Sequence, residues 1–171
     1  TKSLNSRKAR QITAGEFEVS NVTLLNDDSQ FLFRANVRHP GDYQVYSVST
    51  GDRNVSAPTA LTDLEGNNQF ELSPDQSKLL LSHSSLLRPE ELYLVDLSSN
   101  NAVKKLTNTV SEEFLSMPWT QPEIVQVPSS HQDKPIYSKV YYPKDYQQGE
   151  KRRAVIFSHG AGYLQNSDKG F

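Results

Sequence analysis

The sequence predicts a mainly β protein, with two four-stranded repeats of the β-propeller-blade type followed by the first strands of an α/β domain. Between Gln11 and about Thr109, turn residues separate short β-branched and aromatic runs, which is typical of an antiparallel meander. The two halves of this region also match each other. After Leu106 the pattern changes, and an apolar run without polar alternation follows near the end of the sequence.

Each repeat contains four strand-like runs. In the first repeat these are "EFEVSNVTLL", "QFLFRANV", "YQVYSVST" and "APTALTD", and in the second "QFELS", "KLLLSHSS", "ELYLVDLS" and "AVKKLTN". We match "NDDSQFLF" with "SPDQSKLLL", "HPGDYQVYSVSTG" with "RPEELYLVDLSSN", and "ALTD" with "KLTN". The Ser-Pro-Asp-x-Ser stretch predicts a tight turn before the second strand of its repeat.

The spacing of the matched positions fits a β-propeller. It is about 45 to 50 residues, the length of one four-stranded blade. Because a propeller needs about four blades to close its ring, two blades predict that the chain is a fragment of a larger protein. The alternative is a β-sandwich whose halves resemble each other by chance.

A connector and a new domain follow the repeats. "SEEFLSMPWTQP" places Trp119 between two prolines, which predicts an extended connector and a boundary near Pro118 to Pro122. We therefore expect domains at residues 1–117 and 118–171. "PEIVQVPSS" and "IYSKVYYP" predict a β-hairpin, and "AVIFSHG" predicts a third strand, buried on both faces as in a parallel sheet.

The composition excludes several classes of function. The chain has 171 residues, 35% of them hydrophobic and 22% charged, with a formal net charge of −2, so no basic field favours nucleic acid or an anionic membrane. No apolar run approaches the ~20 residues that cross a bilayer. The absence of cysteine excludes disulfides and thiolate catalysis.

The titratable residues do not form a metal-binding pattern. The four histidines lack ligand spacing, so we expect no metal. We interpret His39 and His83 as hydrogen-bonded structural residues and His131 as an exposed residue of the hairpin turn. The adjacent acids Glu90 and Glu91 indicate a solvated edge rather than an acid and base pair.

The stretch "HGAGY" is the candidate site. A glycine-rich turn after a buried strand can present backbone amides to a developing oxyanion, as the corresponding loop of α/β-hydrolases does. A plain turn is the alternative. The Gly-x-Ser-x-Gly stretch that would carry the nucleophile does not occur in the sequence, and Ser158 and His159 would point to opposite faces of a strand. We therefore assign no catalytic residue in this chain.

The order of these parts resembles the prolyl oligopeptidase family of serine peptidases, and within it the dipeptidyl peptidase IV type. The stretches "LTD", "SPDQSKLLL", "PEELYLVDL", "KLT", the hairpin and "HGAGYLQN" carry the resemblance from about Gln11 to Phe171. It implies the last propeller blades, followed by the first strands of an α/β-hydrolase domain. It also implies peptide hydrolysis by a Ser-Asp-His triad beyond Phe171, without metal or cofactor.

The resemblance further assigns the oxyanion loop to His159, Gly160, Ala161, Gly162 and Tyr163. Several relatives carry tyrosine where His159 falls, so only the backbone role carries over. Peptide substrates are implied for the whole protein, while the chain alone is expected to be inactive. A homo-oligomer or companion chain is expected to cover the apolar hydrolase strands.

Three further questions remain open at the level of sequence. The resemblance favours a periplasmic or secreted location, with the cytoplasm as the alternative. The whole protein could instead be a non-catalytic binding protein that carries a propeller, or an esterase or acylaminoacyl-releasing hydrolase. The sequence does not separate exopeptidase from endopeptidase activity.

Overall fold

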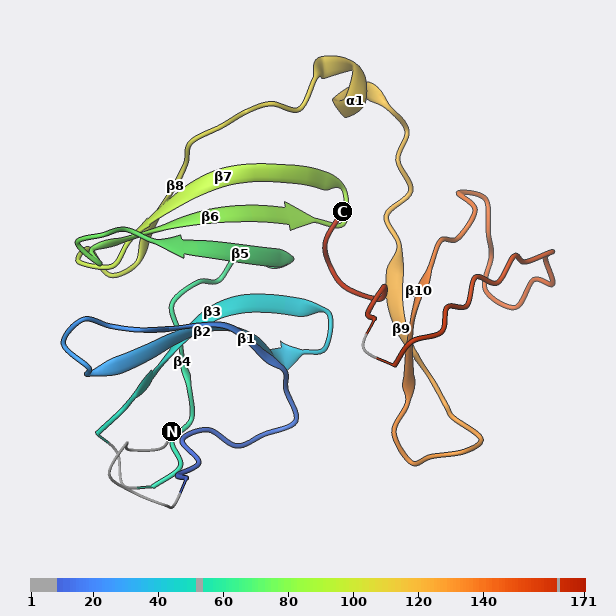
Figure 1. Ribbon diagram of the computed structural model, residues 1–171. Helices are drawn as coiled ribbons and strands as arrows, with labels where there is room; N and C mark the ends of the chain where they lie inside the picture. Colours follow the sequence, from blue (N-terminus) through green and yellow to red (C-terminus); the bar gives the residue numbers. More distant parts are fainter. Residues whose placement is uncertain (1–8, 52–53, 163) are drawn as a thin grey trace. The chain divides into compact units, whose positions relative to one another are not determined.

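The computed structural model describes residues 9–51, 54–162 and 164–171 (Figure 1). Its contacts divide the chain into two compact units. The first unit comprises residues up to Val110 together with Lys169–Phe171, and the second comprises Ser111–Asp168. The described residues are mainly β, as the sequence predicts, with one short helix.

The first unit consists of two four-stranded antiparallel meanders. The first meander contains β1 (Val19–Leu24), β2 (Gln30–His39), β3 (Asp42–Ser49) and β4 (Thr59–Ala60), and the second contains β5 (Asn67–Leu72), β6 (Lys78–Ser85), β7 (Arg88–Asp96) and β8 (Ala102–Lys105). A parallel bridge between Tyr43 and Asn67 joins β3 to β5. The eight strands predicted for this region are all present.

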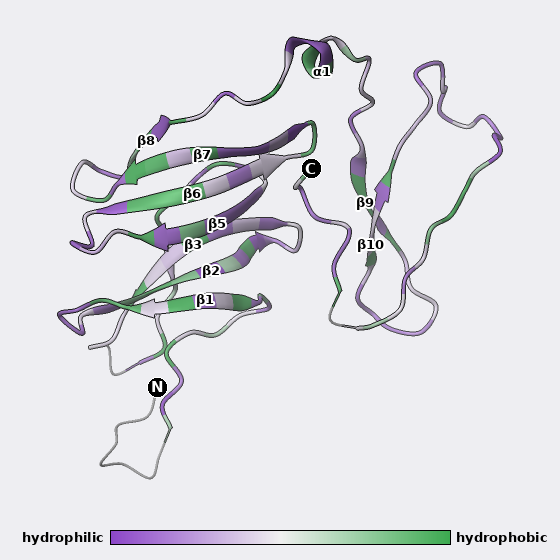
Figure 2. Ribbon diagram, turned by 45° about the horizontal axis from the view of Figure 1, so that its top comes forward, coloured by the Kyte–Doolittle hydropathy of each residue, from purple (hydrophilic) through white to green (hydrophobic). Residues whose placement is uncertain are grey.

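The core of the first unit lies between the two meanders. Leu32 and Val45 of the first meander pack against four buried residues of the second, namely Phe70, Leu79, Leu81 and Val95. Figure 2 shows the hydrophobic stretch in the middle of β6, which supplies the two leucines. A second cluster, formed by Phe33, Ala35, Tyr46 and Val48, lies on the opposite face of the first meander. The first meander is therefore apolar on both faces.

The turn before the second strand has the same chemistry in both meanders. The Asp75 carboxylate accepts hydrogen bonds from the backbone amide and the hydroxyl of Ser77, at 3.1 and 2.9 Å. Asp27 accepts from the corresponding groups of Ser29, at 3.0 and 2.7 Å. The hydrogen bond from the Ser73 hydroxyl is the main cause that lowers the pKa of Asp75 to about 2, and the two bonds from Ser77 act in the same direction. The turn predicted at Ser-Pro-Asp-x-Ser is confirmed, with an offset of 48 residues from Asp27 to Asp75.

The second unit begins with helix α1 (Glu112–Ser116), which the sequence analysis did not anticipate. The Ser111 hydroxyl accepts a hydrogen bond from the Phe114 amide and caps the helix. The indole of Trp119 then donates to the Phe114 carbonyl at 2.8 Å, and the two rings pack with centroids 4.7 Å apart. The connector is therefore a capped helical turn rather than a wholly extended segment.

The hairpin predicted after the connector is confirmed. It consists of β9 (Glu123–Val127) and β10 (Ile136–Val140), paired antiparallel from Ile136 opposite Val127 to Val140 opposite Glu123. His131 is exposed in the connection between the two strands, as expected.

The third strand predicted at "AVIFSHG" is wrong for this structure. Residues 154–160 form no strand, and the side chains of Val155, Ile156 and Phe157 are 99%, 89% and 79% exposed. A strand needs a neighbour that accepts and donates its backbone hydrogen bonds. Among the described residues no strand pairs with this run, so its apolar side chains stay largely exposed.

Candidate oxyanion loop and the polar clusters

The described part of the candidate loop, His159–Gly162, is an exposed segment with an open backbone. Ala161 has a φ of +61°, and its carbonyl accepts a hydrogen bond from the Leu164 amide at 3.0 Å. A Cβ atom added at Gly160 or Gly162 would meet nothing within 4 Å. The backbone of this segment is thus accessible from solvent, while Tyr163 lies outside the described residues.

The His159 side chain interacts locally. Its Nδ1 lies 2.8 Å from the carbonyl oxygen of Gly160, and its ring centroid is 6.4 Å from that of Phe157. Both contacts involve residues that are its near neighbours in sequence. The loop can therefore offer backbone N–H groups to an anionic atom, which is the chemistry that an oxyanion site requires.

Polar contacts within the second unit hold the chain before and after the loop. Before it, Arg152 pairs with Asp145 at 3.2 Å and with Glu150 at 2.7 Å. After it, the Ser167 hydroxyl donates to the Tyr137 carbonyl at 2.9 Å, and Asp168 lies 3.6 Å from the Lys139 ammonium. The ion pair after the loop is more buried than the ion pairs before it. The loop therefore lies between two segments that polar contacts hold in place.

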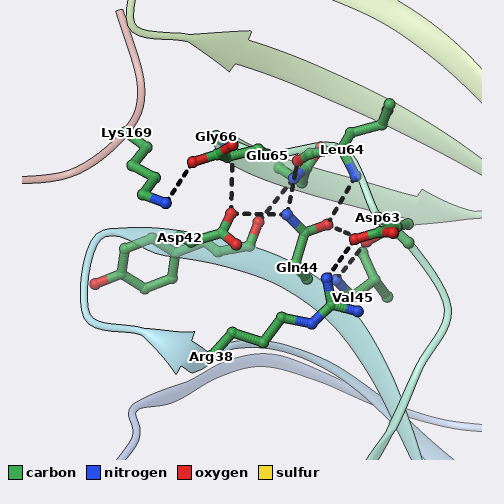
Figure 3. Close-up of polar contacts among 12 residues, drawn as sticks. Arg38, Asp42, Gln44, Val45, Asp63, Leu64, Glu65, Gly66 and Lys169 are labelled. Carbon is green, nitrogen blue, oxygen red and sulfur yellow. Dashed lines mark hydrogen bonds and ion pairs between the residues drawn. The ribbon is translucent and has the colours of Figure 1, made fainter.

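A buried polar cluster joins the two meanders of the first unit (Figure 3). Gln44 is completely buried, and its side-chain carbonyl accepts hydrogen bonds from the Thr62 hydroxyl at 2.8 Å and the Leu64 amide at 3.3 Å. Its amide donates to the Leu64 carbonyl and to Asp42, and the Asp42 carboxylate also accepts from the Gly66 amide at 3.0 Å. The cluster fixes the connector that leads from β4 to β5.

The second meander repeats this arrangement with a carboxylate in place of the amide. Glu91 accepts hydrogen bonds from the Thr107 hydroxyl and from the backbone amides of Thr109 and Val110, at 2.7 and 3.3 Å for the two amides. The backbone amide after each acceptor donates to the equivalent threonine at 2.9 Å in both repeats. Glu91 is only 4% exposed, so the prediction of a solvated edge is wrong for this residue.

The structure also corrects the sequence match of the third strands. Strand pairing places Gln44 opposite Ala35 and Glu91 opposite His83, so the equivalent residues are 47 apart. Matching "HPGDYQ" with "RPEELY" gives an offset of 49, from His39 to Arg88. The chain between the paired positions is one residue shorter in the second meander. The proline at the second position of each stretch suggested the offset of 49, which the strand pairing does not support.

Hydrogen bonding controls the protonation of Glu91. The bond from the Thr107 hydroxyl is the main cause of its lowered pKa, and it outweighs the opposing effect of desolvation. The backbone amides and the Lys105 ammonium, 3.9 Å away, act in the same direction. Glu91 therefore holds the end of β8 and the connector after it in its deprotonated, carboxylate form.

The two histidines of the meanders are structural, as the sequence predicts. The His83 Nδ1 lies 2.9 Å from the Asn68 side-chain oxygen, and its ring packs edge-on against Tyr93. The His39 Nδ1 accepts a hydrogen bond from the Gly41 amide at 3.0 Å. Burial is the main cause that lowers the pKa of each imidazole from its ordinary value of 6.5.

The described residues contain neither a metal-binding cluster nor a membrane-spanning helix. No group of three or more histidine, aspartate or glutamate side chains in that part of the chain could hold a metal ion. None of the helices there is long and apolar enough to cross a membrane.

Comparison with known proteins identifies the family. Residues 1–90, just over half of the chain, match the family described as the dipeptidyl peptidase IV (DPP IV) N-terminal region. The chain belongs to the dipeptidyl peptidase IV family. No curated protein sequence matches this member of the family.

Solved structures support the same relationship at the level of the fold. The crystal structure of Porphyromonas gingivalis dipeptidyl peptidase 4 matches 81% of this chain with a TM-score of 0.67 and 16% sequence identity. The match covers 19% of the Porphyromonas chain, so this sequence spans less than a fifth of that protein. In all, 72 chains of solved structures match this family member.

We expect Gln44→Ala to lower the free energy of unfolding of the chain by about 1–3 kcal/mol, because the Leu64 amide and the Thr62 hydroxyl lose a buried acceptor. Urea unfolding followed by circular dichroism measures the change. Gln69→Ala, at an exposed position of β5, is the control and should change stability by no more than about 0.5 kcal/mol. Equal losses in both variants would contradict a structural role of the cluster.

Stability should fall as the pH drops below 6.5, because the half-buried His39 and the buried His83 resist protonation in the folded state. The unfolded state then binds protons that the folded state does not, so the contribution is complete above 6.5 and is lost as the pH falls through the lowered folded-state pKa. Unfolding at pH 7.5 and 5.5 tests this. His83→Gln should reduce the difference but not abolish it, since His39 acts in the same direction.

Proposed function

We propose that this chain is the junction segment of a longer serine peptidase of the dipeptidyl peptidase type, the parent enzyme. Residues 1–117 supply two four-stranded propeller blades, and residues 118–171 begin an α/β-hydrolase domain and carry its oxyanion loop. The Ser-Asp-His triad belongs to other residues of the parent enzyme. The observation that carries this proposal is the family match over residues 1–90, followed downstream by an open glycine loop.

In this proposal the loop stabilises the negative charge that develops during acyl transfer. When a serine attacks the scissile peptide carbonyl, the carbonyl oxygen becomes an oxyanion. Backbone N–H groups of Gly160–Gly162 donate hydrogen bonds to that oxygen, and preorganised donors of this kind lower the barrier more than donors that must first reorient. Peptides are the substrates, and the chemistry needs neither a metal nor an organic cofactor.

The parent enzyme should hydrolyse the chromogenic amide of a proline-containing dipeptide and react with a fluorophosphonate probe. The 171-residue chain alone should do neither, because it lacks the nucleophile. A parent enzyme that cleaves only a short acyl ester would be an esterase of the same fold, and one that neither hydrolyses nor reacts would be a binding protein. Labelling of the purified 171-residue chain would refute the assignment of the triad to other residues.

We expect Gly160→Pro to lower kcat of the parent enzyme by about 10²–10³-fold with little change in KM, because proline removes one backbone donor that acts in the transition state. Gly160→Ala is the matched control. It keeps the N–H group, and its Cβ has open space. If both variants lose activity equally, the loss comes from the backbone shape of the loop and not from the donor.

The exposed apolar run also needs a partner. We infer that other parts of the parent enzyme, or a second chain, cover Val155–Phe157.

The isolated chain should therefore associate as its concentration rises, because burying the run removes apolar surface from water. Light scattering over a concentration series measures this, and Ile156→Lys should shift the association to higher concentration. Leu115→Lys, at a 47% exposed position of α1, is the control. Equal behaviour of the two variants would contradict a role of the run in association.

A further inference from the structure

Residues Lys169–Phe171 pack as part of the first unit, and we call them the docked tripeptide. The Lys169 amide donates to the Gly41 carbonyl at 2.7 Å. The Phe171 amide donates to the Ser84 hydroxyl oxygen at 3.4 Å. Gly41 lies in the turn between β2 and β3, whereas Ser84 lies on β6. The backbone of the docked tripeptide is therefore bound by both meanders.

The first position of the docked tripeptide suits a basic side chain. The Lys169 ammonium forms an ion pair with Glu65 (Figure 3). The side chain of Lys169 is 22% exposed and that of Glu65 is 70% exposed. The stem of the lysine is thus covered while its charge meets a carboxylate that solvent reaches. A long apolar stem that ends in a cation fits such a place, so arginine should be accepted as well.

The second position suits only glycine. Gly170 is buried, and a Cβ atom added there would lie 3.0 Å from the Cβ of Asn67 and 3.2 Å from the Ser84 hydroxyl oxygen. Contacts of this length are tighter than nine in ten real Cβ contacts. Asn67 and Ser84 are cross-strand partners on β5 and β6, and the Asn67 side-chain oxygen also accepts from Arg34 at 2.7 Å. A larger residue at position 170 would therefore push against a fixed pair.

The third position is bound through its backbone. The Phe171 amide makes the hydrogen bond to Ser84, while the residue is 60% exposed. Any residue except proline keeps this donor. The bound pattern is therefore a basic residue, glycine and a residue other than proline. Of the eight glycines in the sequence, Gly170 alone follows a lysine or arginine.

The receptor side is fixed by contacts of its own. Gly66, next to Glu65, has a φ of +145°, and a Cβ atom added there would lie 2.1 Å from the Ser84 carbonyl oxygen. The Asp42 carboxylate accepts from the Gly66 amide at 3.0 Å, and the Gly66 carbonyl accepts from the Tyr43 amide at 2.9 Å. The buried polar cluster thus holds the backbone beside Glu65. A preformed receptor loses little conformational entropy on binding.

We propose that Gly41, Glu65, Asn67 and Ser84 form a peptide-docking site, the seat, for a basic residue followed by glycine, which residues 169–171 of the same chain occupy. The inference does not depend on the proposed peptidase function, because every contact that carries it lies within the first unit. Three residues offer few contacts, so a free peptide should bind with a dissociation constant on the order of 1 mM. The tethered segment competes with it through its high effective concentration.

The test is binding of the acetylated and amidated peptide Lys-Gly-Phe to the 171-residue chain, followed by NMR shifts of the Asn67 and Ser84 amides. Gly170→Val expels the tethered segment from the seat and should bind the peptide about tenfold more tightly than the wild type does. Lys169→Glu, which repels the segment from Glu65, should act in the same direction. Its substitution lies outside the crowded centre of the seat, so it serves if Gly170→Val does not fold.

Matched peptides and a charge exchange test the selectivity. The Lys-Val-Phe and Glu-Gly-Phe peptides should not bind to the chain with Gly170→Val. Adding Glu65→Lys to that chain should abolish binding of Lys-Gly-Phe and introduce binding of Glu-Gly-Phe. Asp63→Lys changes another exposed carboxylate of the same connector and is the control that leaves binding unchanged. Equal binding of Lys-Gly-Phe and Lys-Val-Phe, or no effect of Glu65→Lys, would overturn the proposed site.

A measurement on the wild-type chain needs no variant. The Lys169 amide should exchange with solvent more slowly than an unstructured amide, because the Gly41 carbonyl accepts it. Excess Lys-Gly-Phe peptide should accelerate this exchange by displacing the tethered segment. Exchange at the unstructured rate without peptide would overturn the occupancy of the seat by residues 169–171.

Discussion

The structure depends on one repeated interaction, in which a polar side chain near the start of each third strand binds the connector that leaves the fourth strand. Gln44 performs this role in the first meander and Glu91 in the second. Each accepts from a threonine hydroxyl, Gln44 also from one backbone amide of the connector and Glu91 from two. Backbone N–H groups of the connectors that are not paired in a sheet need another acceptor. The side chain supplies that acceptor and sets where the next segment begins.

The two clusters hold the segments at which the chain leaves each meander. The first orders the backbone around Gly66, and Glu65 lies beside it. Glu65 in turn pairs with Lys169. The second cluster orders residues 107–110, where the chain leaves the meanders.

The use of an amide in one repeat and a carboxylate in the other has a physical reason. The Gln44 side chain must both accept from the connector and donate to the Leu64 carbonyl and Asp42, which a carboxylate cannot do. The hydrogen bonds to Glu91 that the structure assigns all end on acceptor oxygens, so the anion suits them. The negative charge of Glu91 also lies near the ammonium group of Lys105 on the neighbouring strand, β8.

The sequence by itself determined the strands of the meanders, the aspartate turns and the hairpin, because alternating bulky residues and turn residues are local signals. It also pointed to the family through the order of these parts. The clusters of Gln44 and Glu91 were missed, although the paired "LTD" and "LTN" stretches contain the two threonines that bind them. Local patterns do not report which distant group a polar side chain meets.

Only the tertiary structure decided the register of the repeats, the burial of Glu91 and the state of Val155–Phe157. The register depends on which residues pair across the sheet. One residue fewer between two strands changes the partner of every residue in them. The apolar run reads as a buried strand in sequence, yet it lies exposed because a strand exists only with a neighbour to pair with. Burial and pairing are properties of the surroundings, and the sequence of one segment does not contain them.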